Sequence, residues 1–243
     1  MKLSVVIPAY NEEKRITKTL ESVNEYLTKQ DFDYEILVVA NNCTDNTDKV
    51  VLDLKNKIKN LELMDIGAGI PGKGGAVKVG FLKAQGEYIM FMDADNATKI
   101  NELDHFWNYF DEGYDIVIGS RDTKGSKVVV SQAWYKELAG KIGNLLIQIV
   151  ALPGIHDTQC GFKIFKQKVV KDVFPIQKLG GWGFDIEILA LAKKFGYKIK
   201  EEPITWFNAV GSKVSMGDYL HVFSDLFKVR WWLWTGVYKV KKL

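Results

Sequence analysis

The feature that most constrains this chain is an apolar run, Tyr88–Met92, which ends abruptly at two acidic residues, Asp93 and Asp95. Such a run is typical of a strand that is buried on both faces, as in a parallel sheet. The two carboxylates then lie at the carboxyl end of the strand, where open α/β sheets hold their ligands. Adjacent like charges favour a cation between them, and Mg²⁺ or Mn²⁺ prefers oxygen ligands and substrate phosphates. The alternative is an acidic turn that caps the next helix.

Strand-like and helix-like segments alternate along the first 120 residues with short connections, which predicts a mostly parallel, doubly wound sheet with helices on both faces. We expect strands at 3–7 (ended by Pro8), 34–40, 61–66, 88–92 and 115–119, and helices at 11–29, 45–57, 75–85 and 102–110. The pattern then changes to a helix at 134–150, a short strand at 161–165, a helix at 184–195 and a β segment at 198–207. No linker-like composition separates the halves, so we expect one catalytic unit, 1–215, and a C-terminal segment, 216–243.

Composition limits the class of protein. The chain of 243 residues has a formal charge of +3, which is too small to indicate a nucleic-acid partner. Its two cysteines, Cys43 and Cys160, have no metal-type spacing, so we expect a reducing cytoplasm. We expect no signal peptide and no membrane span, because the first strand begins at once and no apolar run approaches about 20 residues. Any contact with a membrane is then peripheral, on its inner face.

A glycine-rich loop, Gly67–Gly74, matches two nucleotide-binding patterns only in part. Gly67, Gly69 and Gly72 have dinucleotide-binding spacing, but the acidic residue 20 positions on, Glu87, starts a strand instead of ending one. A P-loop would need Ser or Thr where Gly74 stands. The simpler interpretation is that Lys73 and the amides at a helix start receive a phosphate, and the alternative is a flexible loop with a solvated lysine.

The C-terminal segment combines aromatic and basic side chains. From residue 221 to 243 there are five Lys or Arg residues and one Asp, a formal charge of +4. Aromatic residues among basic ones are typical of a segment that lies on an anionic lipid surface. The alternative is a helix that packs its aromatic side chains onto the domain or forms a dimer. The aromatic residues concerned are Phe223, Phe227, Trp231, Trp232, Trp234 and Tyr238.

Taken together, several stretches resemble the family 2 glycosyltransferases, which have a nucleotide-binding fold of the A type. The opening strand with its loop, residues 5–12, the Lys73–Val77 stretch and Asp93-Ala94-Asp95 resemble motifs of the whole family. Residues 93–99, 119–121, 157–163 (Asp-Thr-Gln-Cys-Gly-Phe-Lys), 182–187 and 211–213 resemble one branch, the dolichyl-phosphate β-glucosyltransferases. The dolichyl-phosphate mannose synthases are a step further off. The resemblance covers nearly the whole chain.

The resemblance implies an inverting, metal-dependent transfer of a hexose from a nucleotide sugar, UDP-glucose by the nearer branch, onto a polyprenyl phosphate. Asp93 and Asp95 would hold Mg²⁺ or Mn²⁺ and the donor diphosphate, and Asp157 would orient the acceptor or a cation. The remaining donor-binding residues would be Pro8, Tyr10, Glu12, Asn42, Lys73 and Lys213. The acceptor phosphate would meet Arg121, Lys136, Ser212 and Lys213. An acceptor phosphate is already ionised at neutral pH, so no strong general base is needed.

Other functions remain open. Family members commonly carry an acid where Asn42 stands, which leaves the donor base undecided, and Ala97 replaces a glutamine of the mannose synthases. The alternatives are a mannose synthase that uses GDP-mannose, a transferase to a glycan or protein hydroxyl with Asp157 as base, and a non-enzymatic sugar-nucleotide binder at a membrane surface. The oligomeric state is not predicted.

Some residues of the second half have structural alternatives. Asp157 can cap a turn, and Trp182 is expected in the core more than against a sugar. Asp185 and Glu187 can be solvated helix positions or partners of Lys and Arg.

Overall fold

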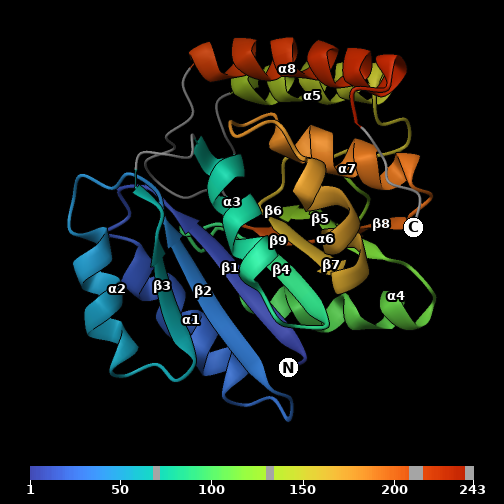
Figure 1. The fold of residues 1–243 in the computed structure, drawn as a ribbon. Coiled ribbons are helices and arrows are strands. Elements are labelled where there is room, and N and C mark those ends of the chain that lie inside the picture. Colours follow the sequence, from blue (N-terminus) through green and yellow to red (C-terminus); the bar gives the residue numbers. More distant parts are fainter. Residues whose placement is uncertain (68–71, 130–133, 208–215, 239–243) are drawn as a thin grey trace.

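The computed structural model describes residues 1–67, 72–129, 134–207 and 216–238, with the backbone alone given for 134–139 and 216. A twisted seven-stranded sheet forms the centre, and helices cover both of its faces (Figure 1). The strands are β1 (Leu3–Ala9), β2 (Tyr34–Ala40), β3 (Leu61–Asp65), β4 (Tyr88–Met92), β5 (Ile116–Ser120), β6 (Lys127–Val128), β7 (Phe162–Lys166), β8 (Ile199–Pro203) and β9 (Thr205–Trp206). The helices are α1 (Ile16–Leu27), α2 (Thr47–Lys55), α3 (Gly72–Lys83), η2 (Ile100–His105), α4 (Trp107–Asp111), α5 (Trp134–Val150), α6 (Gln167–Val173), η3 (Phe174–Ile176), α7 (Phe184–Lys194) and α8 (Met216–Thr235).

The order of the strands in the large sheet is β3-β2-β1-β4-β7-β5-β8. Six of these described strands run in the same direction, and β7 runs antiparallel between β4 and β5. The predicted fold class, a mostly parallel sheet with helices on both faces and a C-terminal helix, is therefore confirmed. The short strands β6 and β9 form a separate parallel pair.

The two faces of the sheet carry two cores because successive side chains of a strand point in opposite directions. Val5 and Ile7 of β1 join the core that packs under α1 and α2, whereas Val6 joins the core under α3, α6 and α7. The strands β1, β2, β4 and β5 are almost fully buried. This explains why their sequences are continuous apolar runs without polar alternation.

The predicted boundaries differ from the structure in several places. The helix expected at 11–29 begins only at Ile16, as α1, and the β segment expected at 198–207 is divided into β8 and β9. β1 continues through Pro8 to Ala9, where it pairs with β2 but no longer with β4, so the missing N–H of Pro8 is tolerated at this edge. The helix expected at 102–110 is divided into η2 and α4. α3 begins at Gly72, three residues earlier than expected, because its first glycines pack directly on segment 180–184.

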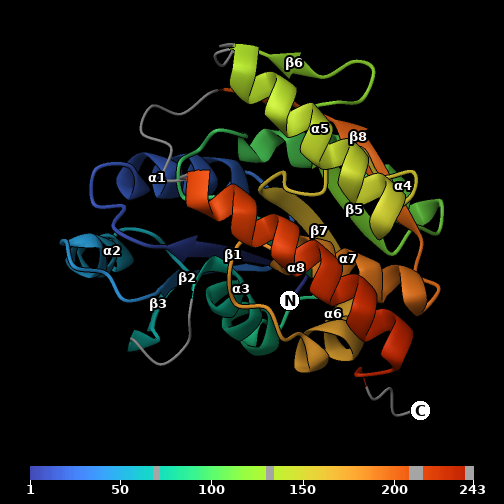
Figure 2. The same cartoon turned by 90° about the horizontal axis from the view of Figure 1, so that it is seen from above.

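The C-terminal helix α8 lies beside α5 and above α7, as Figures 1 and 2 both show. Its buried residues Leu226 and Val229 belong to the core, and Trp232 packs against that core. Tyr238, after the helix, is also buried, and its hydroxyl donates to Glu187 Oε1 at 2.7 Å. Part of the aromatic segment therefore packs on the domain. Among the described helices, none is both long enough and apolar enough to cross a bilayer.

Two glycines test how closely the helices approach their neighbours. A Cβ added at Gly80 of α3 would lie 2.4 Å from Val6 Cγ1, whereas one at Gly140 of α5 has no atom of the described residues within 4 Å. We expect Gly80→Ala to lower the free energy of unfolding by about 1–3 kcal/mol through overpacking. Gly140→Ala should raise it by up to about 1 kcal/mol through helix propensity. Urea unfolding measures both changes in the free energy of unfolding. Changes of the same sign in the two variants would contradict the packing of α3 on β1.

Candidate active site

The predicted pair of carboxylates lies at the carboxyl end of β4. The backbone N–H of Asp93 donates to Gly161 O at 3.0 Å, and the hydroxyl of Thr19 in α1 donates to Ala94 O at 2.7 Å. A Cβ added at Gly161 would come within 1.9 Å of Asp93 Oδ2, so the Asp93 carboxylate rests directly on the glycine backbone. The loop that carries Asp93 and Asp95 is thus fixed between α1 and the segment before β7.

The two carboxylates repel each other. Partial burial raises the pKa of Asp95, and the charge of Asp93 adds to this effect. The N–H of Ala97, which donates to Asp95 Oδ1 at 3.0 Å, and the charges of Arg15 and Lys73 oppose the shift. Because the net effect is a raised pKa, the site favours an additional cation near Asp95.

Lys73, at the start of α3, contacts this pair directly. Its Nζ lies 2.6 Å from Asp93 Oδ1, and the side chains are 18% and 33% exposed. The ammonium also lies 5.1 Å from the ring centroids of Phe91 and Trp182. The alternative interpretation, a solvated lysine in a flexible loop, is therefore wrong, because Lys73 is largely buried and lies in α3. Trp182 is half-buried beside Lys73 and outside the core clusters, so the expectation of core packing is wrong.

Arg121 follows β5 and binds Asp157 through two parallel contacts. Nε donates to Oδ2 at 2.7 Å, Nη2 donates to Oδ1 at 2.9 Å, and the Arg121 backbone N–H donates to Oδ2 at 3.0 Å. Asp157 is fully buried, and although burial acts to raise its pKa, the Arg121 guanidinium outweighs it and lowers the pKa. A carboxylate engaged in this way is a poor general base. Its observed role is to hold Arg121.

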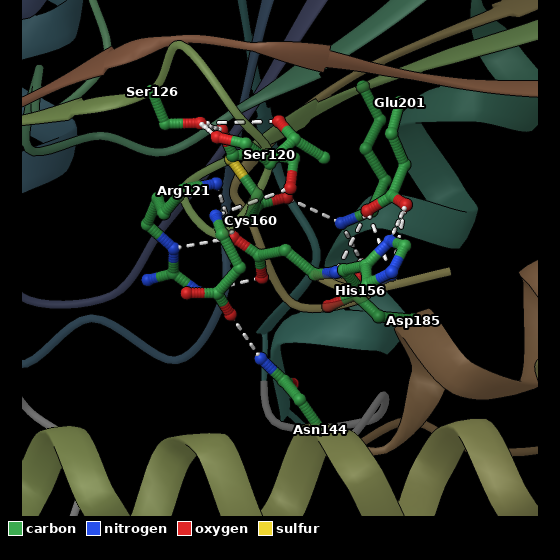
Figure 3. A network of polar contacts seen from close by, with 12 residues as sticks. Ser120, Arg121, Ser126, Asn144, His156, Cys160, Asp185 and Glu201 are labelled. Carbon is green, nitrogen blue, oxygen red and sulfur yellow. Dashed lines mark hydrogen bonds and ion pairs between the residues drawn. The ribbon is translucent and has the colours of Figure 1, made fainter. Parts of the chain in front are cut away.

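A second layer of polar contacts fixes this pair (Figure 3). Glu201 of β8 accepts the backbone N–H groups of His156 and Asp157, each at 2.9 Å. Asn144 of α5 donates to Asp122 Oδ2 at 2.7 Å, which ties α5 to the residue after Arg121. Glu201 and Asn144 were not predicted, because neither belongs to a recognisable motif and only the tertiary fold brings them here.

The motif 157–163 continues into a buried ion pair below the rim. Lys163 Nζ of β7 lies 2.6 Å from Asp185 Oδ1 of α7, and both side chains are almost fully buried. The solvated alternative for Asp185 and Glu187 is therefore wrong, because Glu187 is buried too and accepts from Tyr238. Cys160 lies in the same cluster as a free thiol, and burial raises its pKa to about 12.

The expected donor-binding residues of the first two loops gather around the end of β1. Tyr10 is exposed and Asn42 is exposed with φ +56°, a left-handed conformation that asparagine tolerates. Glu12 is buried and accepts from Arg15 Nε and Nη2, each at 2.7 Å. Asp93 and Asp95 also interact electrostatically with Arg15, and no local sequence pattern distinguishes Arg15 from Lys14. Pro8 lies half-buried at the strand end.

The side chains of three other predicted site residues are not among those that the structure describes. Ser212 and Lys213 lie outside the described residues, and Lys136 belongs to the part of α5 for which only the backbone is described. The described rim thus combines two carboxylates, one lysine and one arginine from β4, α3 and β5. Across the described residues, no group of three or more His, Cys, Asp or Glu side chains could by itself hold a metal ion. A metal ion at this rim would therefore take its further ligands from water or from a substrate.

The two aspartates follow β4 at the switch point of the sheet, between β1 and β4, where open α/β sheets bind their ligands. The chain belongs to glycosyl transferase family 2, whose model matches residues 4–174. The prediction of this family and of a glycosyltransferase is therefore confirmed.

Within the family, the chain is similar to dolichyl-phosphate beta-glucosyltransferases. It is 34% identical to one from Trichomonas vaginalis over 93% of this chain and 72% of that protein. It is 35% identical to the one from Saccharomyces cerevisiae over 99% and 77%. The structure resembles Mycobacterium tuberculosis glucosyl-3-phosphoglycerate synthase, crystallised with Mn²⁺, UDP-glucose and phosphoglyceric acid, with a TM-score of 0.66, 18% identity and coverage of 94% and 79%.

The pair of Arg121 and Asp157 predicts a pH-dependent stability. The folded-state pKa of Asp157 is lowered, so its contribution is present above the unfolded pKa of about 3.9 and is lost as the pH falls from there through the folded pKa. We expect Asp157→Asn to destabilise the protein by about 3 kcal/mol at pH 7. The difference from wild type should shrink below about pH 4. Thermal melts against pH measure this.

The control for this experiment is Asp122→Asn, which removes a neighbouring but exposed carboxylate. It should change the stability by much less at pH 7. A difference between Asp157→Asn and wild type that stays constant down to pH 2 would contradict the prediction.

Proposed function

We propose that this protein transfers glucose from UDP-glucose onto a dolichyl-type polyprenyl phosphate, with inversion at the anomeric carbon and with Mg²⁺ or Mn²⁺ as cofactor. The names of the similar dolichyl-phosphate beta-glucosyltransferases support the acceptor and the sugar. The structural neighbour crystallised with Mn²⁺ and UDP-glucose supports the donor and the metal. The observation that carries the proposal is that one motif, 157–163, contacts both sides of the rim. Its Gly161 packs against Asp93, and its Asp157 holds Arg121.

Asp93 and Asp95 fit a divalent cation that also binds a diphosphate. Mg²⁺ is usually held by one or two carboxylates together with substrate phosphates, and this is the number of acids that the rim offers. Burial and, after it, the charge of Asp93 raise the pKa of Asp95, and a bound cation would stabilise the charged carboxylates. When bound, the cation supplies charge stabilisation to the departing diphosphate. Lys73, beside Asp93, supplies a second positive charge in the same place.

Arg121 is the proposed anchor of the acceptor phosphate. Asp157 holds the guanidinium in a fixed orientation, and Trp206 lies with its ring centroid 5.5 Å from the guanidinium carbon. In the reaction, a phosphate oxygen of the acceptor forms a bond to C1 of the sugar, while the bond from C1 to the UDP oxygen breaks and its electron pair leaves with UDP. The acceptor oxygen carries no proton that must be removed. The commitment of Asp157 to Arg121 therefore disfavours the alternative with a hydroxyl acceptor, which needs a base.

The surface that we propose for membrane contact consists of the exposed apolar side chains of α5 and α8. These helices lie side by side, and Asn144 of α5 donates to Asp122, the residue that follows Arg121. Lys228 and Arg230 are exposed among the aromatic residues of α8, so the surface matches anionic lipid. The exposed apolar residues are Ile142, Leu145, Leu146 and Ile149 of α5 and Leu220, Phe227, Trp231 and Trp234 of α8.

The first test of the proposal is transfer itself. Protein, Mg²⁺ or Mn²⁺, radiolabelled UDP-glucose and a short-chain dolichyl phosphate should give label in the lipid fraction. Asp95→Asn should lower the rate by about 10²–10³-fold, because one charge at the leaving group is lost. Asp53→Asn, on the exposed face of α2, is the control and should leave the rate unchanged. GDP-mannose serves as a competing donor.

An unchanged rate for Asp95→Asn would remove the metal role. Label from GDP-mannose but not from UDP-glucose would instead assign the mannose synthase alternative, and no transfer from either donor would reject the proposed reaction.

The membrane surface is tested by one substitution at two places. Leu220 of α8 is 69% exposed and Leu52 of α2 is 52% exposed. Leu220→Glu should weaken binding to vesicles that contain anionic lipid, because it adds a negative charge to the proposed apolar contact. Leu52→Glu adds the same charge elsewhere and should bind like wild type. Sedimentation with vesicles measures both, and equal binding of the two variants would contradict the assigned surface.

A further inference from the structure

The contact between Lys73 and Asp93 joins two groups that the proposed function assigns to different partners. Lys73 is proposed to bind the donor phosphates, and Asp93 is proposed to bind the divalent cation. In the structure Nζ of Lys73 lies 2.6 Å from Oδ1 of Asp93. An ammonium therefore already neutralises the carboxylate that the metal is expected to use.

Lys73 is held in this position by its surroundings. Phe91 and Trp182 place their rings 5.1 Å from the ammonium, which is within the range of cation–π attraction. Burial opposes the charged form of Lys73, but the carboxylates of Asp93, Asp185 and Asp95 outweigh it. Lys73 thus offsets the negative charge of the acidic rim.

Two positive partners compete for one carboxylate. A divalent cation near Asp93 and Asp95 would be repelled by the Lys73 ammonium as long as that ammonium remains at Asp93. The donor diphosphate carries several negative charges and offers Lys73 a new partner. Departure of Lys73 from Asp93 is then favourable only when the diphosphate arrives, and it removes the repulsion that opposes the metal.

We propose that Lys73 is an exchangeable counter-ion: it occupies the metal-binding carboxylate in the free enzyme and moves to the diphosphate when metal and donor bind together. This inference rests on the proposed function, because it requires a metal and a diphosphate at this rim. Its consequence is that metal alone binds weakly and that nucleotide strengthens metal binding. The coupling is reciprocal, so metal strengthens nucleotide binding by the same factor.

Binding of Mn²⁺ to the protein tests the exchange without any measurement of activity. The loss of the Mn²⁺ paramagnetic-resonance signal on binding gives the affinity with and without UDP. In the absence of UDP, Lys73→Met should bind Mn²⁺ at least about tenfold more tightly than wild type, because a competing positive charge is gone. UDP should improve the Mn²⁺ affinity of wild type more than that of Lys73→Met.

Lys83→Met is the matched control. Lys83 is exposed at the other end of α3, about 15 Å along the helix from Lys73, and its removal changes the net charge equally. It should bind Mn²⁺ like wild type. Lys73→Gln is a second removal of the charge that serves if Lys73→Met does not fold, and melting curves establish which variant is folded.

Equal Mn²⁺ affinity of wild type and the folded Lys73 variant in the absence of UDP would overturn the exchange. Weaker binding by the variant would also overturn it, because Lys73 would then support the metal site. These outcomes are separate from the failure of the proposed function. If wild type neither binds Mn²⁺ with UDP-glucose nor transfers glucose, the metal-dependent reaction itself is rejected.

Discussion

The antiparallel insertion of β7 between β4 and β5 is the constraint on which the rest of this site depends. β4 and β5 both run toward the rim, so a strand that pairs with them in the opposite direction must begin there. The residues that precede β7, 157–161, consequently lie between the ends of both neighbours. One short segment thereby contacts Asp93 through Gly161 and Arg121 through Asp157. A parallel strand in this position would place the same residues at the far edge of the sheet.

Three acidic groups at and below the rim each form an ion pair with a basic side chain, and these pairs differ in burial. Asp157 and Asp185 are buried and are held by Arg121 and Lys163 in closed ion pairs, which fix geometry at a desolvation cost. Asp93 is one-third exposed and its partner is a long lysine side chain. The buried pairs therefore form a rigid frame, while the exposed pair can open toward a ligand that carries phosphate.

The sequence was sufficient for the elements with strong periodicity and for motifs that stay together in the chain. The 134–150 helix was predicted to the residue, and the β4 strand with its two aspartates lies where the apolar run indicated. Partnerships between distant segments were not predictable. The pairing of Lys163 with Asp185 and the support of Asp157 by Glu201 depend on strand order, which a local pattern does not specify.

In the glycine-rich stretch, a local pattern was present but its structural reason was not predictable from the sequence. Its spacing suggested a phosphate cradle, yet a Cβ added at Gly74 would lie 2.5 Å from Phe184 Cβ, so this glycine is required by helix packing. Gly75 donates its N–H to Gly180 O at 3.1 Å in the same contact. Close approach of α3 to the segment before α7 is what brings Lys73 beside both Asp93 and Trp182. The glycines therefore act on the chemistry indirectly, by positioning a cation against the acidic rim.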